Sequence, residues 1–565
     1  MASSSNLLAP AAPAAPLAPA APALAAGRGG RRIDGLLGVR AALWIAVAAL
    51  IVVPAAAIVW LAVTGGGWDA LADPAVTEAA INSLVSAFLS GALAVVVGTG
   101  FALLLERTDL PGRRALRILA LSPLLMPPFV GAIAWLSLLG PASSLNTWWA
   151  ARFGGPLWNL YGGDGVIFLL TVHGYPIVML IVTAALRRVP ADLEQAARIT
   201  GASPLRTMCE VTLPLLRPAM LSSFTLVSVS NLADFGIPSI VGLPERYVTL
   251  STLVYRFLQS GTVDDPLAVV SAIGLVLLAI ALAGVVVDLL RAKTRVELDA
   301  QAAQAAPLPL GRLRIPVAVA TAAVVVAATI LPLVTLTIQA LLPAPGVPLT
   351  AETVTLASFE RALTASGTLT GVANSLMLAT LAALICGVLG LAIGTLVTRT
   401  RARANAALLG ISLLPQAIPG LVIAVAWLVL APRIGLQNTP WIILCAYLTS
   451  FLALVVQSVT APLSSTSVSA EEAARVSGAS RLRALWDISS RMAIPAAISG
   501  AVLVALTAVR ELTLSVLLLS PGSQTLGVVI FNLQQAGAYN ASSALSLIVA
   551  LVGLAGLGIT ARRKR

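Results

Sequence analysis

The sequence predicts an all-α integral membrane protein with about twelve transmembrane helices, arranged as two parallel six-helix repeats that each carry a helical loop on the cytoplasmic side. The first observation is composition: 58% of the 565 residues are hydrophobic and 10% are charged. Soluble domains carry about 25% charged residues, so this composition excludes a soluble globular protein. The second observation is a series of long apolar runs, and the third is an internal repeat.

Twelve apolar runs are each about 20 residues long, which is the length that crosses the hydrocarbon core of a bilayer. They lie near residues 41–63, 83–105, 116–140, 164–186, 218–242, 267–290, 316–341, 375–398, 406–431, 441–463, 496–519 and 542–560. The Pro- and Ala-rich residues that precede the first run cannot bury a core, so we expect them to be disordered. The chain then divides into a disordered tail (1–40), a first six-helix unit (41–290), a polar linker (291–315), a second six-helix unit (316–560) and a basic tail (561–565).

The distribution of positive charge predicts the orientation of these helices. Cytoplasmic loops of membrane proteins carry an excess of Lys and Arg. With a cytoplasmic N-terminus, the cytoplasmic segments hold 29 of the 35 basic residues, and the opposite orientation would place those 29 outside. We therefore expect both termini in the cytoplasm. The net charge of +12 is interpreted as an orientation signal and not as a nucleic-acid-binding surface.

The two units share a sequence motif between their fourth and fifth apolar runs. D-L-E-Q-A-A-R-I-T-G-A-S-P-L-R extends from Asp192 to Arg206 (the first motif loop), and S-A-E-E-A-A-R-V-S-G-A-S-R-L-R extends from Ser469 to Arg483 (the second motif loop), at an offset of 277 residues. Earlier matches at an offset of 292 residues pair Asn82 with Asn374, Pro127 with Pro419 and Trp135 with Trp427. Repeats of this kind are related by an axis along the membrane normal.

Each motif loop predicts two short helices folded over a glycine. The residue pairs with capping-box spacing, which would start the first helix, are Asp192 with Gln195 and Ser469 with Glu472. Gly201 and Gly478 stand where a left-handed cap would end that helix. Ser203 and Ser480 can then start the second helix. A single copy could be an ordinary amphipathic loop on the membrane surface, but two copies at equivalent positions favour a docking surface.

At these residues the chain resembles the permease subunits of ABC importers, whose signature is E-A-A, three residues and then Gly. The resemblance covers residues 41–560 and implies that each motif loop is a coupling helix that contacts a cytoplasmic ATPase. In the first motif loop the implied contact residues are Glu194, Gln195, Ala196, Ala197, Gly201, Leu205 and Arg206. In the second motif loop they are Glu471, Glu472, Ala473, Ala474, Gly478, Leu482 and Arg483. Gln195 replaces the acid usual in the family, so we expect unequal ATPase contacts.

Three further segments resemble the fused iron(III) importers: R-T-D-L-P-G-R-R after the second run, A-D-F-G-I-P in the fifth, and L-S-P-G near residue 520. Similar fused permeases serve thiamine, 2-aminoethylphosphonate or polyamines. The resemblance implies a multi-pass protein of the bacterial inner membrane. Its implied partners are an ATPase dimer that binds ATP-Mg and a periplasmic or extracellular substrate-binding protein.

The sequence predicts neither an enzyme nor a cofactor site in this chain. The lysines are Lys293 and Lys564, and neither completes the G-x-x-x-x-G-K-[ST] phosphate-binding loop, so ATP hydrolysis would belong to a partner. The three cysteines are isolated and predict no metal site or disulfide. The alternative function from another class is a secondary transporter with two six-helix halves, which would need no coupling loops. Co-purification with an ATPase distinguishes the two.

Charged residues inside the predicted spans indicate where a substrate would pass. Asp234 and Glu511 are offset by 277 residues, and each lies about 22 Å from the cytoplasmic end of its fifth span. A carboxylate at that depth is costly and normally faces a cavity or a partner. We identify these acids and Arg510 as candidates for the translocation path. Alternatively, Asp234 satisfies the backbone at a helix break and Glu511 pairs with a neighbouring helix. The single histidine, His173, is expected to be a helix-packing residue.

Overall fold

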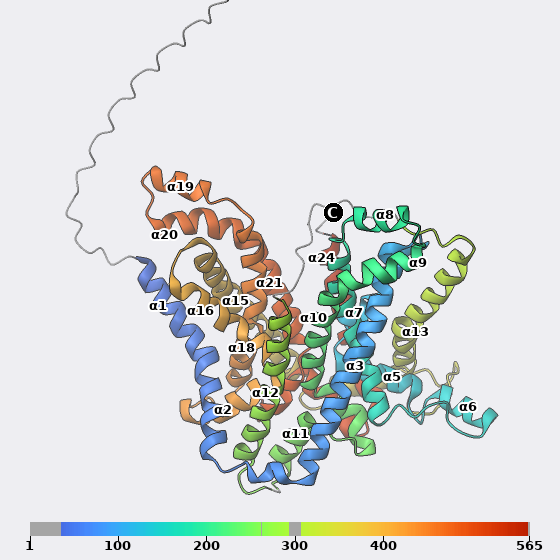
Figure 1. Cartoon of the computed structure of the whole chain (residues 1–565). Helices are drawn as coiled ribbons and strands as arrows, with labels where there is room; N and C mark the ends of the chain where they lie inside the picture. Colours follow the sequence, from blue (N-terminus) through green and yellow to red (C-terminus); the bar gives the residue numbers. More distant parts are fainter. Residues whose placement is uncertain (1–34, 262, 293–306, 563–565) are drawn as a thin grey trace, which may run out of the picture.

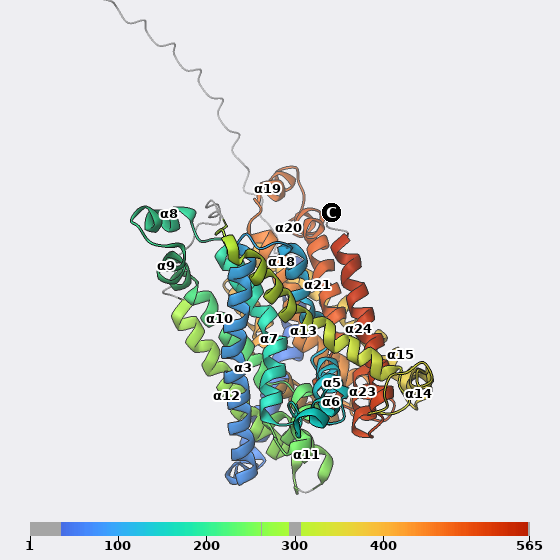
Figure 2. The same cartoon turned by 90° about the vertical axis from the view of Figure 1, so that its right-hand side faces the viewer.

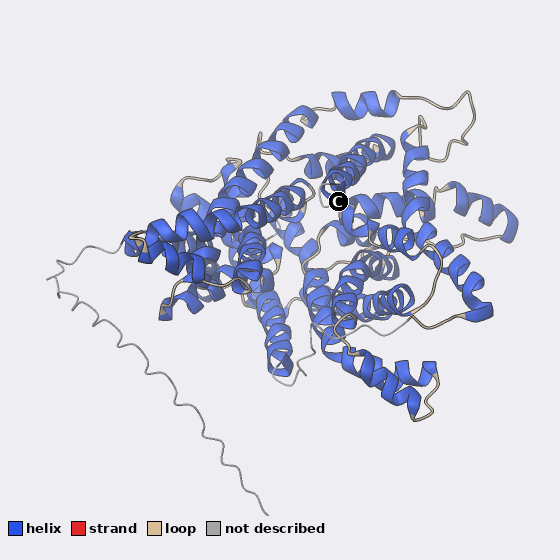
Figure 3. Cartoon of the chain, turned by 90° about the horizontal axis from the view of Figure 1, so that it is seen from above, coloured by secondary structure: helices blue, strands red, loops and turns tan. Residues whose placement is uncertain are grey.

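The computed structural model describes residues 35–261, 263–292 and 307–562, which form helices and loops (Figure 3). These residues also include one isolated β-bridge, between Thr108 and Leu308. Within these ranges, ten helices are long and apolar enough to cross a membrane. One further pair of helices passes the same test but is sharply bent. The prediction of an all-α membrane protein is confirmed.

The helices fall into two series that correspond to the two predicted units. The first unit contains α1 (Gly35–Val47), α2 (Val53–Thr64), α3 (Pro74–Arg107), α4 (Arg113–Ala120), α5 (Pro128–Leu139), α6 (Ser144–Phe153), α7 (Gly163–Leu186), α8 (Ala191–Ile199), α9 (Pro204–Thr207), α10 (Leu213–Leu232), α11 (Leu250–Ser260) and α12 (Pro266–Ala292). The second unit contains α13 (Arg314–Ala340), α14 (Ala357–Thr364), α15 (Thr368–Arg399), α16 (Arg403–Leu413), α17 (Gly420–Leu430), α18 (Trp441–Ser464), α19 (Ser469–Val476), α20 (Arg481–Ala484), α21 (Arg491–Val509), α22 (Thr513–Leu517), α23 (Leu526–Gln535) and α24 (Tyr539–Arg562).

The ends of the chain differ slightly from the prediction. Helix α1 begins at Gly35, so the first six residues of the helix fall in the range expected to be a disordered tail. The prediction of disorder for residues 1–34 lies outside the described residues, as do most of the linker (293–306) and the last three residues.

The third predicted span of each unit is not a single straight helix, which corrects the prediction. In the second unit, the segments Arg403–Ala417 and Gly420–Ile434 meet at an angle of 107°. Pro419 precedes α17 with a ψ of 135°, and Pro127 precedes α5 with a ψ of 136°. These extended ψ values, together with the N–H that proline lacks, interrupt the helix at the same repeat position in both units.

The second, fourth and fifth spans form the centre of each unit. Helix α3 packs against α7 and α10, and α15 packs against α18 and α21. A Cβ added at Gly98 in α3 would lie 2.6 Å from the Tyr175 carbonyl oxygen, and one added at Gly390 in α15 would lie 2.6 Å from Val455 Cβ. These matched glycines therefore let the helices approach closely, as small residues commonly do between membrane helices.

The first span of each unit packs against the other unit. Helix α2 contacts α17, while α13 contacts α5, and each also contacts the last span of its own unit. On the first-unit side, the Thr449 hydroxyl donates to the Leu50 carbonyl at 2.7 Å, and Arg40 donates to Thr400 at 3.3 Å. The two units are thus interlocked through their first helices.

Both motif loops lie at the same end of the molecule. In Figures 1 and 2, α8 and α9 of the first unit and α19 and α20 of the second unit project from the upper end, where α1 also begins and α24 ends. Helices α6 and α11 lie toward the opposite end (Figure 1). This arrangement is the one that a parallel repeat requires.

Candidate functional site

The first motif loop folds as two short helices joined by a left-handed glycine. Gly201 has a φ of 92°, and its N–H donates to the Arg198 carbonyl at 3.1 Å. The next N–H, from Ala202, donates to the Ala197 carbonyl at 3.0 Å. These two bonds make the Schellman cap that ends α8, and the Ser203 hydroxyl then caps α9.

The second motif loop repeats this geometry. Gly478 has a φ of 94°, its N–H donates to Arg475, and Ala479 donates to Ala474. Ser480 accepts from the Arg483 N–H at 3.3 Å and starts α20. The predicted positions of the turn and of the second helix are therefore confirmed in both loops.

The predicted capping boxes are wrong. Helix α8 begins after Pro190 and α19 begins after Val468, and neither of these residues provides a side-chain cap. Asp192 consequently lies within the first turn of α8 and not at its N-cap. Ser469 is the first residue of α19, and its hydroxyl bonds to that of Ser467 at 2.9 Å. The sequence has the spacing of a capping box, but the N-cap position of each helix lies one or two residues before the expected N-cap residue.

Glu194 of the first motif loop points toward the membrane-spanning helices. Its Oε1 atom lies 3.0 Å from an Arg107 guanidinium nitrogen and accepts a hydrogen bond from Thr212 at 2.9 Å. Arg107, the last residue of α3, also donates to the Leu186 carbonyl at 3.2 Å. The Arg107 and Glu194 side chains are only 6% and 12% exposed, so this ion pair is buried.

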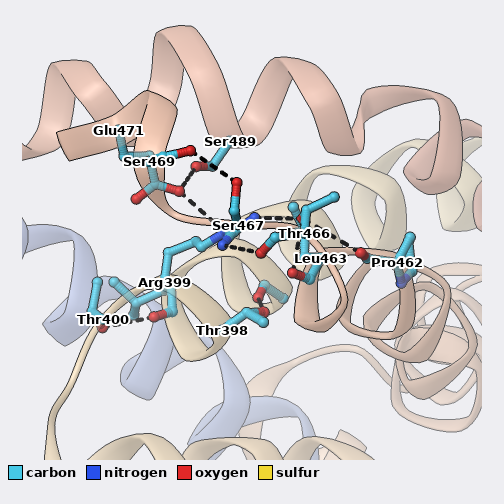
Figure 4. A network of polar contacts seen from close by, with 12 residues as sticks. Thr398, Arg399, Thr400, Pro462, Leu463, Thr466, Ser467, Ser469, Glu471 and Ser489 are labelled. Atoms are coloured by element: carbon cyan, nitrogen blue, oxygen red, sulfur yellow. Dashed lines mark hydrogen bonds and ion pairs between the residues drawn. The ribbon is translucent and has the colours of Figure 1, made fainter. Parts of the chain in front are cut away.

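Glu471 of the second motif loop has the same partners in the second unit (Figure 4). Its carboxylate lies 3.1 Å from Arg399, the last residue of α15, and accepts a hydrogen bond from Ser489. Arg399 also donates to the Thr466 carbonyl at 3.0 Å. The sequence analysis missed both arginines and both hydroxyl residues as parts of the site. Their shared repeat offsets, 292 and 277 residues, were the signal that could have identified them.

The other residues implied by the resemblance lie on the outer surface of the motif loops. The exposed ones are Gln195, Ala196, Gly201, Leu205 and Arg206 in the first loop, and Glu472, Ala473, Gly478, Leu482 and Arg483 in the second, whereas Ala197 and Ala474 are half-buried. Ile199 and Val476, which the sequence analysis did not select, are 87% and 89% exposed. Each loop therefore presents apolar side chains that nothing in the described chain covers.

A cavity of about 320 Å³ lies between the two units and is lined by all three candidate path residues. Asp234 follows the end of α10, and its Oδ1 accepts the Ile237 N–H at 2.8 Å. Glu511 follows the end of α21 and accepts the N–H groups of Leu514 at 2.8 Å and Ser515 at 3.2 Å. The fifth span is thus broken in both units, which corrects the prediction of continuous helices over 218–242 and 496–519. Each acid both faces the cavity and satisfies the backbone at a break.

Two basic side chains also line the cavity. Arg510 donates to the carbonyl of Leu124, so it reaches across to the first unit. His173 donates from Nδ1 to the Leu169 carbonyl at 2.9 Å, and its buried Nε2 has no hydrogen-bond partner among the described residues. His173 packs closely against Gly131, which agrees with the predicted packing role. It also contributes a polar atom to the lining of the cavity. The described residues contain no group of three side chains suited to bind a metal.

The fold and the paired loops define a polytopic membrane protein made of two related units. Residues 94–296 and 387–562 each match the family described as the binding-protein-dependent transport system inner membrane component. The chain therefore belongs to this family of transporter permeases.

Relatives in this family extend over one or both units. The chain is 24% identical over 485 residues to the Fe(3+)-transport system permease protein FbpB 2 of Haemophilus influenzae, covering 86% of this chain and 89% of the relative. It is 30% identical to the putative ferric transport system permease protein FbpB 1 of the same organism, but the match covers 36% of this chain and only 32% of that relative. It is also 30% identical to the molybdenum transport system permease protein ModB of Mycobacterium bovis, covering 41% of this chain and 85% of the relative.

Proposed function

We propose that this chain is the membrane permease of an ABC importer, which couples ATP hydrolysis by a separate ATPase dimer to substrate uptake. The observation that carries the proposal is the pair of equivalent motif loops at one end of the molecule. Each loop presents two exposed large apolar residues, which are Ile199 and Leu205 in the first loop and Val476 and Leu482 in the second. Contiguous exposed apolar surface commonly marks an interaction site, and two equivalent sites suit two copies of one partner.

The proposed orientation places the motif loops and both termini in the cytoplasm of a bacterial cell. The distribution of Lys and Arg supports this orientation, because the motif-loop end carries most of them. A substrate-binding protein would then deliver the substrate at the opposite end, near α6 and α11. The cavity between the units would be a section of the translocation path.

We propose iron(III) as the substrate. A relative that matches 86% of the chain is named as an Fe(3+)-transport permease, and two carboxylates at the cavity suit a hard cation. The molybdenum permease relative makes an oxyanion the main competitor. Thiamine, 2-aminoethylphosphonate and polyamines are the remaining alternatives.

The test is uptake by proteoliposomes that contain the full chain with its ATPase, supplied with the substrate-binding protein of the same transport system. We expect uptake of radioactive iron(III) only when ATP is present on the ATPase side. Molybdate, thiamine, 2-aminoethylphosphonate and a polyamine are the comparison substrates. ATP-dependent uptake of one of these and not of iron(III) would change the substrate and keep the permease assignment. Uptake that needs no ATPase but follows an ion gradient would contradict the proposal and favour a secondary transporter.

A further inference from the structure

We infer that a buried triad in each unit transmits movement of the motif loop into the membrane. The two triads are Arg107–Glu194–Thr212 and Arg399–Glu471–Ser489. This inference rests on the proposed function and adds the route by which an ATPase would act on the cavity. The six residues are positioning residues, because their side chains bind one another and none of them lines the cavity.

Each triad joins three separate elements through one carboxylate. In the first unit, Glu194 lies on α8, Arg107 ends α3, and Thr212 lies in a π-helical turn, η4 (Met208–Thr212), directly before α10. The second unit has the same order, with its hydroxyl residue in the π-helical turn η10 (Leu485–Ser490) before α21. π-Helical turns are rare and are frequent at functional sites. Their occurrence at the same place in both units supports a shared role.

The ion pair of each triad is costly to break because it is buried. The Arg399 and Glu471 side chains are 3% and 12% exposed, and breaking such a pair would leave an uncompensated charge away from water. By contrast, the pair between Arg206 of the first motif loop and Glu210 of η4 is largely exposed and adds little. The motif loop, the end of the second span and the start of the fifth span should therefore move as one body.

The fifth span carries this movement to the cavity. Helix α10 has 20 residues and α21 has 19, so each reaches about 30 Å from the triad. At their far ends, regular helix stops directly before the cavity-lining acids Asp234 and Glu511. The continuous hydrogen bonds of the helix stop at these breaks. The backbone can therefore change direction there when the helix is displaced.

The first triad has an additional contact with the linker. The Leu308 N–H donates to the Arg107 carbonyl at 2.7 Å, and the Asp109 N–H donates back to the Leu308 carbonyl at 3.2 Å. No described residue of the linker contacts the second triad in this way. We therefore expect the second triad to be the more sensitive of the two to substitution.

The test compares Glu471→Gln with Glu360→Gln in the complete complex of chain, ATPase and binding protein. Glu360 is an exposed carboxylate on α14 with no ion pair to any described residue, so it controls for loss of one negative charge. We measure ATP hydrolysis and substrate uptake in the same proteoliposomes. Glu471→Gln should keep ATPase association. It should lower the amount of substrate taken up per ATP hydrolysed by at least about fivefold, because coupling between two sites usually changes their behaviour by about that factor or more. Glu360→Gln should leave this ratio unchanged.

The double exchange Arg399→Glu with Glu471→Arg should restore part of the lost coupling, because it keeps the ion pair. A gentler variant, Ser489→Ala, removes only the hydroxyl and should lower the ratio in the same direction if Glu471→Gln fails to assemble. Its control is Ser499→Ala, an exposed serine on α21 whose hydroxyl bonds only within its own helix. An unchanged ratio in the triad variants would overturn the inference. A wild-type complex without ATP-driven uptake would instead overturn the proposed function.

Discussion

Arg107 and Glu194 form a buried ion pair of 3.0 Å beneath the first motif loop, and Arg399 and Glu471 repeat it at 3.1 Å beneath the second. The acid that precedes Q-A-A in the first loop and E-A-A in the second is therefore turned toward the membrane-spanning helices. The resemblance implied an ATPase contact for this acid, but its carboxylate is already bound within the chain. The surface left to an ATPase consists of the exposed residues around Gly201 and Gly478.

The turn glycines should be essential for ATPase association. Proline cannot adopt the φ of 94° found at Gly478 and has no N–H to donate to Arg475, so Gly478→Pro should remove the turn. Gly478→Ala should cost about 1–2 kcal/mol through left-handed strain alone. Gly410→Ala, in a helix with open space around it, is the control. Pull-down of the ATPase from membranes with equal permease levels measures the effect, and equal recovery with Gly478→Pro would refute the assignment.

The two motif loops should contribute unequally. Glu472 and Gln195 occupy equivalent exposed positions without a hydrogen-bond or ion-pair partner among the described residues. A carboxylate can pair with a cationic ATPase residue, whereas an amide forms only a neutral hydrogen bond, and charged hydrogen bonds are about twice as strong. We expect Glu472→Gln to weaken ATPase binding more than Gln195→Ala does. Binding curves for the two variants test this, and a larger effect of Gln195→Ala would contradict it.

Removing one negative charge at the cavity should slow uptake of a cation. Asn and Gln keep an oxygen that can accept the Ile237 or Leu514 N–H, so Asp234→Asn and Glu511→Gln preserve the helix breaks. Each lost attraction is worth roughly 1–4 kcal/mol, or about fivefold in rate and upward. Asp265→Asn, which changes an acid that accepts a backbone N–H outside the cavity, is the control.

Uptake assays with membrane levels and ATPase association measured in parallel check this expectation. An oxyanion substrate should show no slowing. Normal iron(III) uptake in the double variant would mean that the acids have a purely structural role, and it would remove one support for iron(III).

The matched glycines between the second and fourth spans should tolerate no large side chain. At Gly98 an added Cβ meets backbone of α7, whereas at Gly100, two residues away, nothing lies within 4 Å. Gly98→Leu and Gly390→Leu should therefore separate these helices and lower the thermal midpoint of the purified protein. Gly100→Leu is the control on the same helix. Equal unfolding temperatures for Gly98→Leu and Gly100→Leu would disprove this packing argument.

Hydropathy and repetition predicted the class of fold, the two units and the turn of each motif loop, because these depend on local sequence. The helix breaks were not predictable in the same way. Pro176 and Pro332 lie inside continuous helices, while Pro127 and Pro419 mark breaks, and hydropathy alone does not distinguish the two cases. The distinguishing signal is the following residue, because Pro127 stands in a P-P and Pro419 in a P-G dipeptide, both typical of turns. The buried triads join residues far apart in the chain, so only their equal repeat spacing pointed to them.

The most direct test of the permease assignment is the mass of the complex that the full chain forms with its ATPase in detergent, measured by native mass spectrometry. Two equivalent motif loops predict one chain with two ATPase subunits, and Gly201→Pro combined with Gly478→Pro should leave the chain alone. A wild-type chain that carries no ATPase, or a double variant that still carries two copies, would contradict the account.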